Sequence, residues 1–516
     1  MNFRTWLESV VHRHASDPFL LFQNEIITFE LFDRRVNALA CAFADLGIRP
    51  GDNVVLLLPN HPAYLYAWFG LVKCGARAVM INTGLVGAGL SHLLRLSGAR
   101  LAVADAALAT HLEHAAQGTA LETVVWHPAP PEGQEHGLHR LLAAYDGQPA
   151  PPVDLTGRDG MSLPHTSGTT GPAKLCLLSH RYYLALAQAA RAVFQLTPAD
   201  VVYNPLPLFH INPHYAVMGA LAAGCRLVIP ERFSASRFWD EVAHYGATVV
   251  ILHLWPLGVL KKQPPGTSVP SHRVRLAFPA DREFMERFDI PAMATVYGST
   301  EAGGITTGRV FRQPLPVGLG VTEPLSSITG RPRDDIEVGI VDQHDELRSA
   351  GEIGEIVVRP KRPHVIFDGY FNMPERTLQS FRNLWFHTGD LGFFDERGEL
   401  HFLGRAADSI RVRGEFVHID ELETLIRTHP AVHDCAVVGV AGEIADQEIL
   451  AILEPRDGHV LDPADLVRFL AGKIADFMVP RYYRIQPLPR VPGTGKVQKE
   501  RLDRSVEAAW DRRQPR

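Results

Sequence analysis

Between residues 30 and about 110 the sequence alternates between helix-like and strand-like segments, and this alternation limits the possible folds more than any other feature. Residues 31–47 carry apolar side chains at helical spacing and end at a glycine, and a strand-like run, 53–60, follows them. A second helix-like stretch, 62–75, leads into the short apolar segment 76–82. Alternation of this kind predicts βαβ units and a largely parallel sheet.

The same alternation resumes over residues 175–300, where the apolar run 249–254 is predicted to be a buried strand. Residues 127–160 are rich in Pro, Gly and His, which predicts a connecting loop region. After about residue 320 the segments become short and alternating and are joined by Gly or Asp turns, which indicates a small antiparallel β unit. The last hundred or so residues return to mixed α and β character. A chain of 516 residues is too long for one ordinary core, so we expect two or more domains of mixed α/β class.

Composition and charge argue against several classes of protein. Hydrophobic residues make up 46% of the chain and charged residues 21%, which excludes a disordered or fibrous protein. The net charge of −6 provides no basic field for nucleic acid or an anionic membrane, so neither is expected as a partner. The most apolar stretches are short and interrupted, whereas a bilayer crossing needs about 20 apolar residues, so no membrane span is predicted.

The five cysteines are scattered singly and form no CxxC pair or Cys/His cluster. We therefore expect neither a structural zinc site nor a disulfide framework, and a reducing cytoplasm fits best. The N-terminal segment has acidic and histidine residues where a signal peptide needs an apolar stretch, which agrees with a cytoplasmic location. The sequence does not indicate an oligomeric state.

The strongest local signal lies in residues 162–180. Small hydroxyl residues and glycines are packed together there, and a lysine follows them. Glycines let backbone N–H groups turn toward one point, hydroxyls add donors and a lysine adds charge, so this pattern is typical of a phosphate-binding loop. A flexible surface loop remains the alternative. The residues concerned are Thr166, Ser167, Gly168, Thr169, Thr170, Gly171 and Lys174.

Three further segments contain candidate functional residues, and each segment taken alone is only a weak indication of function. Glu301 beside Thr300 offers a carboxylate and a hydroxyl suited to Mg²⁺ and phosphate, although an exposed glutamate is usually only solvated. Asp390 is placed to bind vicinal hydroxyls, and Arg405 to reach a ribose or phosphate; a turn aspartate and a surface arginine are the alternatives. Lys496 lies in a Gly/Thr turn near the C-terminus, where most lysines face solvent.

Together, in this order and at these separations, the four segments resemble the adenylate-forming superfamily of acyl-CoA synthetases, peptide-synthetase adenylation domains and firefly luciferase. The resemblance covers nearly the whole chain and ends at Lys496. The sequence of residues 414–423 is most similar to that of acid–CoA ligases of the crotonobetaine/carnitine and coumarate types. The resemblance to the superfamily implies a large N-terminal domain of doubly wound sheets plus a small β unit, followed by a small mobile α+β domain.

The resemblance also implies a nucleotide site for ATP. The loop from Thr166 to Lys174 would handle the β- and γ-phosphates, Tyr297 would stack on adenine, and Asp390 would bind the ribose hydroxyls with support from Arg405. Gly298 and Ser299 belong to the same site. The residues implied in catalysis are Lys496, which would bridge the acid and the α-phosphate, Thr300 on the α-phosphate, Glu301 as the Mg²⁺ ligand, and His210.

The implied reaction makes an acyl-adenylate and pyrophosphate, then a thioester with coenzyme A. Residues 1–404 would bind ATP and acid, and residues 405–516 would swing about a hinge near 405–408. Gly414 would then face the thiol tunnel. A carrier-protein phosphopantetheine as acceptor, or a non-catalytic nucleotide- or acyl-binding relative, remain alternatives.

The chain departs from the family pattern at several positions. Ala407 stands at the hinge where Asp or Lys is usual, which affects the balance between the two poses. His165 replaces an aromatic residue, and Leu175 replaces a glycine. Residues 277–280 replace a Gly-Gly-Ala stretch, which changes the wall of the adenine or acyl pocket.

The acid itself is only partly constrained. His210 stands where amino-acid-activating relatives carry an aspartate, and a histidine cannot supply that buried negative charge, so an α-amino acid is disfavoured. His210 would lie beside the acyl carboxylate or only gate the pocket. The mostly small or apolar wall suits a hydrophobic acid. The predicted acyl pocket comprises Phe209, His210, Asn212, Ala216, Phe278, Pro279, Ala280, Ala302 and Gly303.

Overall fold

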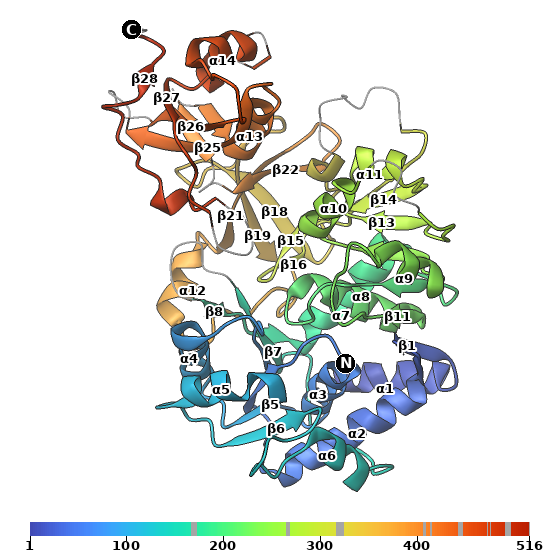
Figure 1. Cartoon of the computed structure of the whole chain (residues 1–516). Helices are drawn as coiled ribbons and strands as arrows, with labels where there is room; N and C mark the ends of the chain where they lie inside the picture. The colour runs from blue at the N-terminus through green and yellow to red at the C-terminus, as the bar shows by residue number, and fades with distance from the viewer. Residues whose placement is uncertain are drawn as a thin grey trace. The chain divides into compact units, whose positions relative to one another are not determined.

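The computed structural model divides into two compact units (Figure 1). One unit comprises Met1–Thr388 with Phe393–Phe402, and the other comprises Gly389–Gly392 with Leu403–Arg516. The predicted domain boundary between residues 404 and 405 stays a prediction. The described residues are 1–166, 173–264, 269–315, 325–405, 409–412, 415–441, 447–471, 473–474, 476–490 and 497–514.

Two large sheets, both mainly parallel, form the framework of the first unit. In spatial order, the seven-stranded sheet contains β6 (Thr123–His127), β5 (Leu101–Asp105), β3 (Asn53–Leu57), β4 (Arg77–Met80), β7 (Gly160–Thr166) and β8 (Lys174–Leu175), with β9 (Leu178–Ser179) on β7. The eight-stranded sheet contains β17 (Arg309–Arg312), β14 (Ala292–Thr295), β13 (Leu276–Phe278), β12 (Val249–Ile251), β10 (Val201–Tyr203), β11 (Arg226–Val228), β1 (Pro18–Phe22) and β2 (Glu25–Thr28).

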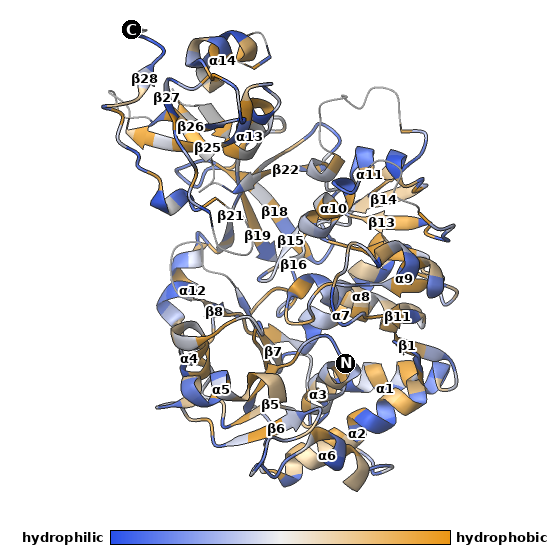
Figure 2. Cartoon of the chain, viewed as in Figure 1, coloured by the Kyte–Doolittle hydropathy of each residue, from blue (hydrophilic) through white to orange (hydrophobic). Residues whose placement is uncertain are grey.

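Helices cover both faces of each sheet, because strands buried on both sides need apolar partners on both sides. Strand β3 shows the pattern: Val54 and Leu56 join the central core, while Val55 and Leu57 join a separate outer cluster. Figure 2 shows the strands as mostly hydrophobic and the outer helix faces as hydrophilic. The central core takes side chains from α1 (Phe3–His14), α2 (Phe29–Asp45), α3 (Pro62–Lys73), α6 (Leu138–Ala144), α7 (His180–Val193) and α8 (Ile211–Ala223). The outer clusters use α4 (Gly87–Ser97) and α5 (Ala109–Ala116) on one sheet and α9 (Phe238–His244), α10 (Leu254–Lys261) and α11 (Arg282–Arg287) on the other.

A small, mainly antiparallel sheet lies mostly within the first unit, as the alternating segments after residue 320 predicted, and its residues 389–392 and 403–405 belong to the second unit. Its strands are β18 (Ile336–Val341), β19 (Gly354–Pro360), β21 (Trp385–Phe394) and β20 (Phe381–Arg382), with β22 (Leu400–Arg405) on β21. Helix α12 (Pro374–Ser380) precedes β20, and the short strands β15 (Gly298–Ser299) and β16 (Gly303–Gly304) form a separate hairpin.

The second unit is a small α+β domain with its own core. Its elements are a hairpin of β23 (Ser409–Val412) and β24 (Glu415–His418), a sheet of β25 (Val432–Ala441), β26 (Gln447–Pro455), β27 (Tyr482–Ile485) and β28 (Trp510–Asp511), and the helices α13 (Ile419–Arg427) and α14 (Pro463–Leu470). The predicted mixed α/β class is therefore confirmed. No helix in the described parts of the chain has the length and apolar character needed to cross a membrane.

Candidate active site

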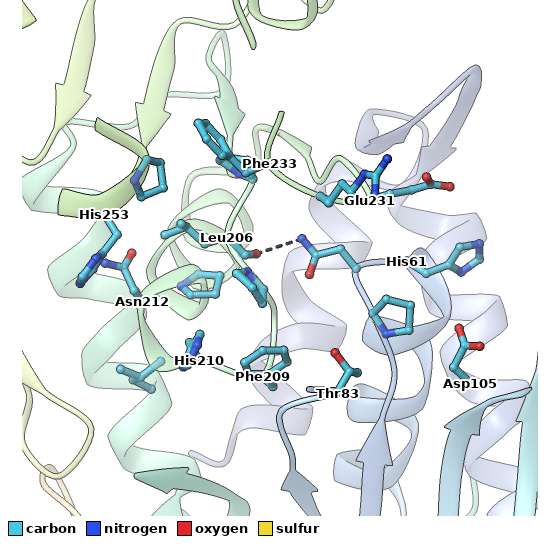
Figure 3. Close-up of a pocket in the computed structure, with 18 of the residues that line it drawn as sticks. His61, Thr83, Asp105, Leu206, Phe209, His210, Asn212, Glu231, Phe233 and His253 are labelled. Carbon is cyan, nitrogen blue, oxygen red and sulfur yellow. Dashed lines mark hydrogen bonds between the residues drawn. The ribbon is translucent and has the colours of Figure 1, made fainter. Parts of the chain in front are cut away.

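A cavity of about 1040 Å³ opens where the carboxyl ends of parallel strands from both large sheets come together. The residues that line it include Asn60 after β3, His165 at the end of β7, Leu206 after β10 and His253 after β12. Ligands of doubly wound folds bind outside the carboxyl ends of the strands, so this is the expected position of a site. Figure 3 shows His253, Asn212 and His210 on one side of the cavity and His61, Asp105 and Glu231 on the other.

One buried side chain fixes the loop that carries His210. Asn60 donates a hydrogen bond from Nδ2 to the carbonyl oxygen of Leu206 at 2.9 Å (Figure 3) and accepts one at Oδ1 from the amide of Leu208, also at 2.9 Å. His214, on the first turns of α8, bonds the carbonyl oxygen of Leu208 through Nε2 at 2.9 Å. These contacts hold the segment before His210 against both sheets.

Histidines line this cavity but carry little charge at neutral pH. The surrounding protein desolvates the ring of His210 and lowers its pKa to about 4, with His165 and His253 adding to the effect. Burial, followed by the nearby His127, lowers the pKa of His61 to about 4 as well. The pKa values of His127, His165 and His253 are also lowered, mainly by desolvation. Among the described residues, no group of three or more His, Cys, Asp or Glu side chains is placed to hold a metal ion.

The two ends of the predicted phosphate loop lie side by side. Thr166 at the end of β7 pairs with Lys174 on β8, and His165 pairs with Leu175. The hydroxyl of Thr166 is buried and has no hydrogen-bond partner among the described residues, which fits a phosphate oxygen as its partner. Residues Ser167, Gly168, Thr169, Thr170 and Gly171, between these ends, lie outside the described residues.

Glu301 and Lys174 meet at the ring of Tyr370. The Tyr370 hydroxyl donates to Glu301 Oε1 at 2.9 Å, and Lys174 Nζ lies 4.0 Å from the centroid of the same ring. The amide of Phe367 donates to the carbonyl oxygen of Glu301 at 2.7 Å, so both its backbone and side chain are held. A half-buried carboxylate beside a phosphate-type loop fits a Mg²⁺ ligand, because Mg²⁺ prefers hard oxygen donors. Burial, followed by the charge of Glu301, raises the pKa of the Cys176 thiol, which is therefore neutral.

Thr300 and its neighbours are positioned by a tight hairpin. The backbone carbonyl of Thr300 accepts a hydrogen bond from the Tyr182 hydroxyl at 3.0 Å, and Thr300 also lines the large cavity. Gly298 pairs with Gly304 across the hairpin, and a Cβ at Gly298 would lie 2.2 Å from the Gly303 carbonyl oxygen, so only glycine fits there. Ser299 Oγ accepts a hydrogen bond from the amide of Ala302 at 3.1 Å.

Two other residues predicted to bind nucleotide have clear partners in this structure. Tyr297 is buried, and its ring stacks on Phe402 with centroids 5.1 Å apart. Asp390, which is 4% exposed, forms an ion pair from Oδ1 to Arg405 Nε at 2.9 Å. The structure thus brings Asp390 and Arg405 together, as a shared ribose site requires. Their binding roles remain predictions.

The predicted acyl-pocket residues divide between two cavities and the core. Phe209, His210 and Asn212 line the large cavity. Asn212 also lines a second cavity of about 90 Å³, as does Phe278. The remaining predicted residues are buried and line neither of these two cavities: Ala216, Pro279, Ala280, Ala302 and Gly303.

Sequence reasoning missed three tyrosines of this region, and three residues that it did predict cannot be compared with the structure. Tyr182, Tyr215 and Tyr370 contact or line the site, yet each stands in an ordinary-looking stretch with no motif spacing to single it out. The three that cannot be compared are Ala407, predicted at the hinge, Gly414, predicted at the thiol tunnel, and Lys496, predicted in catalysis, and all three lie outside the described residues.

Sequence comparisons identify relatives along most of the chain. The sequence model described as AMP-binding enzyme matches residues 7–371, and the model described as AMP-binding enzyme C-terminal domain matches residues 421–496. A crotonobetaine/carnitine–CoA ligase of Escherichia coli O8 (strain IAI1) is 34% identical over 492 residues, covering 91% of this chain and 92% of its own length. The protein of the same name from Shigella dysenteriae serotype 1 (strain Sd197) is 33% identical with the same coverage.

Solved structures share the fold. The anthranilate CoA ligase AuaEII in complex with anthranoyl-AMP superimposes with a TM-score of 0.82 at 24% identity, over 96% of both chains. ATP-bound MatB from Rhodopseudomonas palustris superimposes with a TM-score of 0.80 at 24% identity, over 97% of this chain and 98% of that one.

Proposed function

The chain belongs to the AMP-binding enzyme family, and on that premise we propose that it is an ATP-dependent acid–CoA ligase. It activates a carboxylic acid as its acyl-adenylate with release of pyrophosphate, and then transfers the acyl group to the thiol of coenzyme A. The observation that carries the proposal is the match to both parts of the family, 7–371 and 421–496, together with CoA-ligase relatives along 91% of the chain.

The first half-reaction brings one anion to another, because a carboxylate oxygen attacks the α-phosphorus of ATP. Positioned cations and hydrogen-bond donors are therefore the main help that the protein can supply. We assign Lys174 and the Thr166 hydroxyl to the departing phosphates and Lys496 to the attacking carboxylate and the α-phosphate. Thr300, at the edge of the large cavity, supplies a hydroxyl to an α-phosphate oxygen.

Glu301 is the proposed Mg²⁺ ligand, and the bound ion would neutralise phosphate oxygens. Its carboxylate is already fixed by Tyr370 through the 2.9 Å hydrogen bond, so it does not need to be ordered when nucleotide binds. Asp390 and Arg405, already paired, are assigned to the ribose hydroxyls and the adjacent phosphate. His210 is neutral near pH 7 and is assigned to a hydrogen bond with the acid's carboxylate, not to an ion pair.

The second half-reaction requires the smaller C-terminal part to change its pose. We assign the hinge to residues 405–408, with Ala407 as the pivot, and the pantetheine path to Gly414, where a side chain would obstruct it. We place the reaction in the cytoplasm, because the five cysteines are free thiols, as a reducing compartment maintains them.

Pyrophosphate exchange into ATP over a panel of carboxylic acids tests the first half-reaction, and AMP release with CoA tests the second. Lys496→Ala should lower exchange about 10²- to 10³-fold or more, because one charge-stabilising contact is lost, while ATP binding stays nearly unchanged. Lys473→Ala is the matched control, since Lys473 is an exposed lysine of the same unit that lies over the ring of Phe469.

Exchange that never rises above a blank without acid would refute the enzymatic proposal. Exchange accompanied by AMP release only with a carrier-protein phosphopantetheine, and not with CoA, would correct the acceptor. An unchanged exchange rate in Lys496→Ala would remove that lysine from its assigned role.

A further inference from the structure

The second cavity has a restricted size. At about 90 Å³ it is far smaller than the 1040 Å³ cavity beside it. A single water occupies roughly 10–15 Å³ of such space, so the small cavity admits on the order of half a dozen non-hydrogen atoms. Ile211 and Asn212 line both cavities, so the two cavities adjoin at these residues.

The walls of this cavity combine aromatic rings with one hairpin of the nucleotide site. Phe194 and Phe278 meet edge to face with ring centroids 5.8 Å apart, and both line the cavity. Gly298 and Ser299, the two residues before Thr300, line it as well. A group bound here would thus lie next to the segment assigned to the α-phosphate, where an acyl chain attached to AMP must begin.

Tyr215 is the exceptional residue in this wall. Its side chain is 9% exposed, and its hydroxyl is buried without a hydrogen-bond partner among the described residues. Leaving a buried donor unsatisfied costs about 1–3 kcal/mol, so such a group normally has a partner, and a bound ligand is one. Burial raises the pKa of Tyr215 well above its ordinary value, so the hydroxyl keeps its proton and acts as a donor.

The neighbouring backbone leaves room for this hydroxyl only because position 304 is glycine. A Cβ at Gly304 would lie 2.5 Å from the Tyr215 oxygen, which is closer than any real contact. The side chains that line the small cavity include no acidic or basic residue. The buried guanidinium of Arg333, whose charge acts on Tyr215, is already paired with Asp335 at 2.9 Å. A charged group in the small cavity would therefore be desolvated without a counter-ion of its own, whereas a neutral oxygen acceptor would satisfy Tyr215 at little cost.

We propose that the small cavity takes the acyl chain of the acid and that the Tyr215 hydroxyl donates a hydrogen bond to a neutral oxygen on that chain. The substrate class is therefore a short carboxylic acid with a hydroxyl, carbonyl or ether oxygen. The inference rests on the proposed function, since it names the acid that the same site activates. Tyr215 determines specificity and takes no part in the chemical step.

The test compares pyrophosphate exchange of the full-length enzyme with 3-hydroxybutanoate, 3-oxobutanoate, butanoate, decanoate and carnitine. Wild-type enzyme should favour at least one of the two oxygen-bearing acids over butanoate by tenfold or more in kcat/KM, and it should reject decanoate and carnitine. Tyr215→Phe keeps the ring and removes only the hydroxyl. It should lower kcat/KM for the preferred acid about 10- to 100-fold, mainly through KM, and change butanoate less than threefold.

Tyr64→Phe is the matched control. Tyr64 is fully buried in α3, and its hydroxyl is also unpartnered among the described residues, but it lines neither cavity. This variant should leave every KM unchanged. Equal losses with the oxygen-bearing acid and butanoate in Tyr215→Phe, or a wild-type preference for butanoate, decanoate or carnitine, would overturn the inference while leaving the ligase function intact. No exchange with any acid would overturn both.

Discussion

Tyr370 connects the two residues proposed to bind phosphate and Mg²⁺, because its ring contacts Lys174 and its hydroxyl contacts Glu301. Tyr370→Phe keeps the ring under the lysine but removes the hydrogen bond to the carboxylate. We expect the Mg²⁺ concentration for half-maximal pyrophosphate exchange to rise about tenfold, the equivalent of one lost hydrogen bond to a charged group. The KM for the acid should not change, since Tyr370 lines neither cavity. A Mg²⁺ titration of the exchange rate measures this.

The chain offers a matched control for that variant. Tyr203 donates a hydrogen bond to Glu241 Oε2 at 2.6 Å, the same kind of pair, but neither residue lines the cavities described above. Tyr203→Phe should leave the Mg²⁺ dependence unchanged. If Tyr370→Phe raised the acid KM and not the Mg²⁺ requirement, Tyr370 would belong to acid binding and not to the positioning of Glu301.

At the level of helices, the pair α2 and α3 is joined by a buried ion pair. Lys73, which is 1% exposed, lies 2.6 Å from Asp33 Oδ1 and 2.7 Å from Asn37 Oδ1. Asp33→Ala leaves the buried ammonium with only Asn37 and, at 3.8 Å, the carboxylate of Glu8 as partners, so it should destabilise the first unit by about 2 kcal/mol. Denaturant unfolding followed by tryptophan fluorescence measures this loss.

The double variant Asp33→Ala/Lys73→Met tests the cause. With both charges gone, most of the lost free energy of unfolding should return, because an apolar side chain suits the buried position of Lys73. A double variant as unstable as Asp33→Ala alone would show that the loss comes from packing and not from the buried ammonium that has lost its main partner.

Helices and strands could be predicted from the sequence where their buried apolar residues recur at a regular spacing. The helix-like stretches 31–47 and 62–75 form α2 and α3, and two of the short alternating segments after residue 320 form the antiparallel pair β18 and β19. The buried strand predicted over 249–254 ends at Ile251, because Leu254 begins helix α10 and a proline is tolerated in a first helical turn.

Residues 127–160 show what local pattern could not reveal. The predicted loop region contains helix α6, whose Leu138 is buried in the central core. A short helix among Pro and Gly residues has little periodicity of its own and is stabilised by tertiary packing. The same limit applies to the site. Motif spacing pointed to Thr166, Lys174 and Glu301, but the contacts of Tyr370 and Tyr215 depend on segments far apart in the sequence.

For the whole molecule, buried neutral histidines predict loss of stability in mild acid. Burial lowers the pKa of His180 to about 4 and that of His214 to about 3, and both side chains are at most 1% exposed. In the unfolded chain each titrates near 6.5. Between pH 6.5 and about 4 the unfolded state therefore binds more protons than the folded state, and the free energy of unfolding falls as the pH falls.

The expected size is on the order of 2 kcal/mol for each of these histidines between pH 7 and pH 5. Asp200, whose pKa its hydrogen bonds lower to about 2 despite burial, loses its contribution only below pH 4. Burial raises the pKa of Asp368, so this carboxyl works against the trend and the two histidines must outweigh it. Urea unfolding at pH 7.5, 6 and 5 measures the trend. The amide of Phe3 donates a hydrogen bond to His180 Nδ1 at 3.2 Å. The variant His180→Asn keeps an acceptor for this amide but has no side chain that can be protonated in this pH range. Its free energy of unfolding should therefore depend less steeply on pH than that of the wild type. Stability that is flat or rises from pH 7.5 to pH 5 would mean that these histidines do not stay neutral in the folded state.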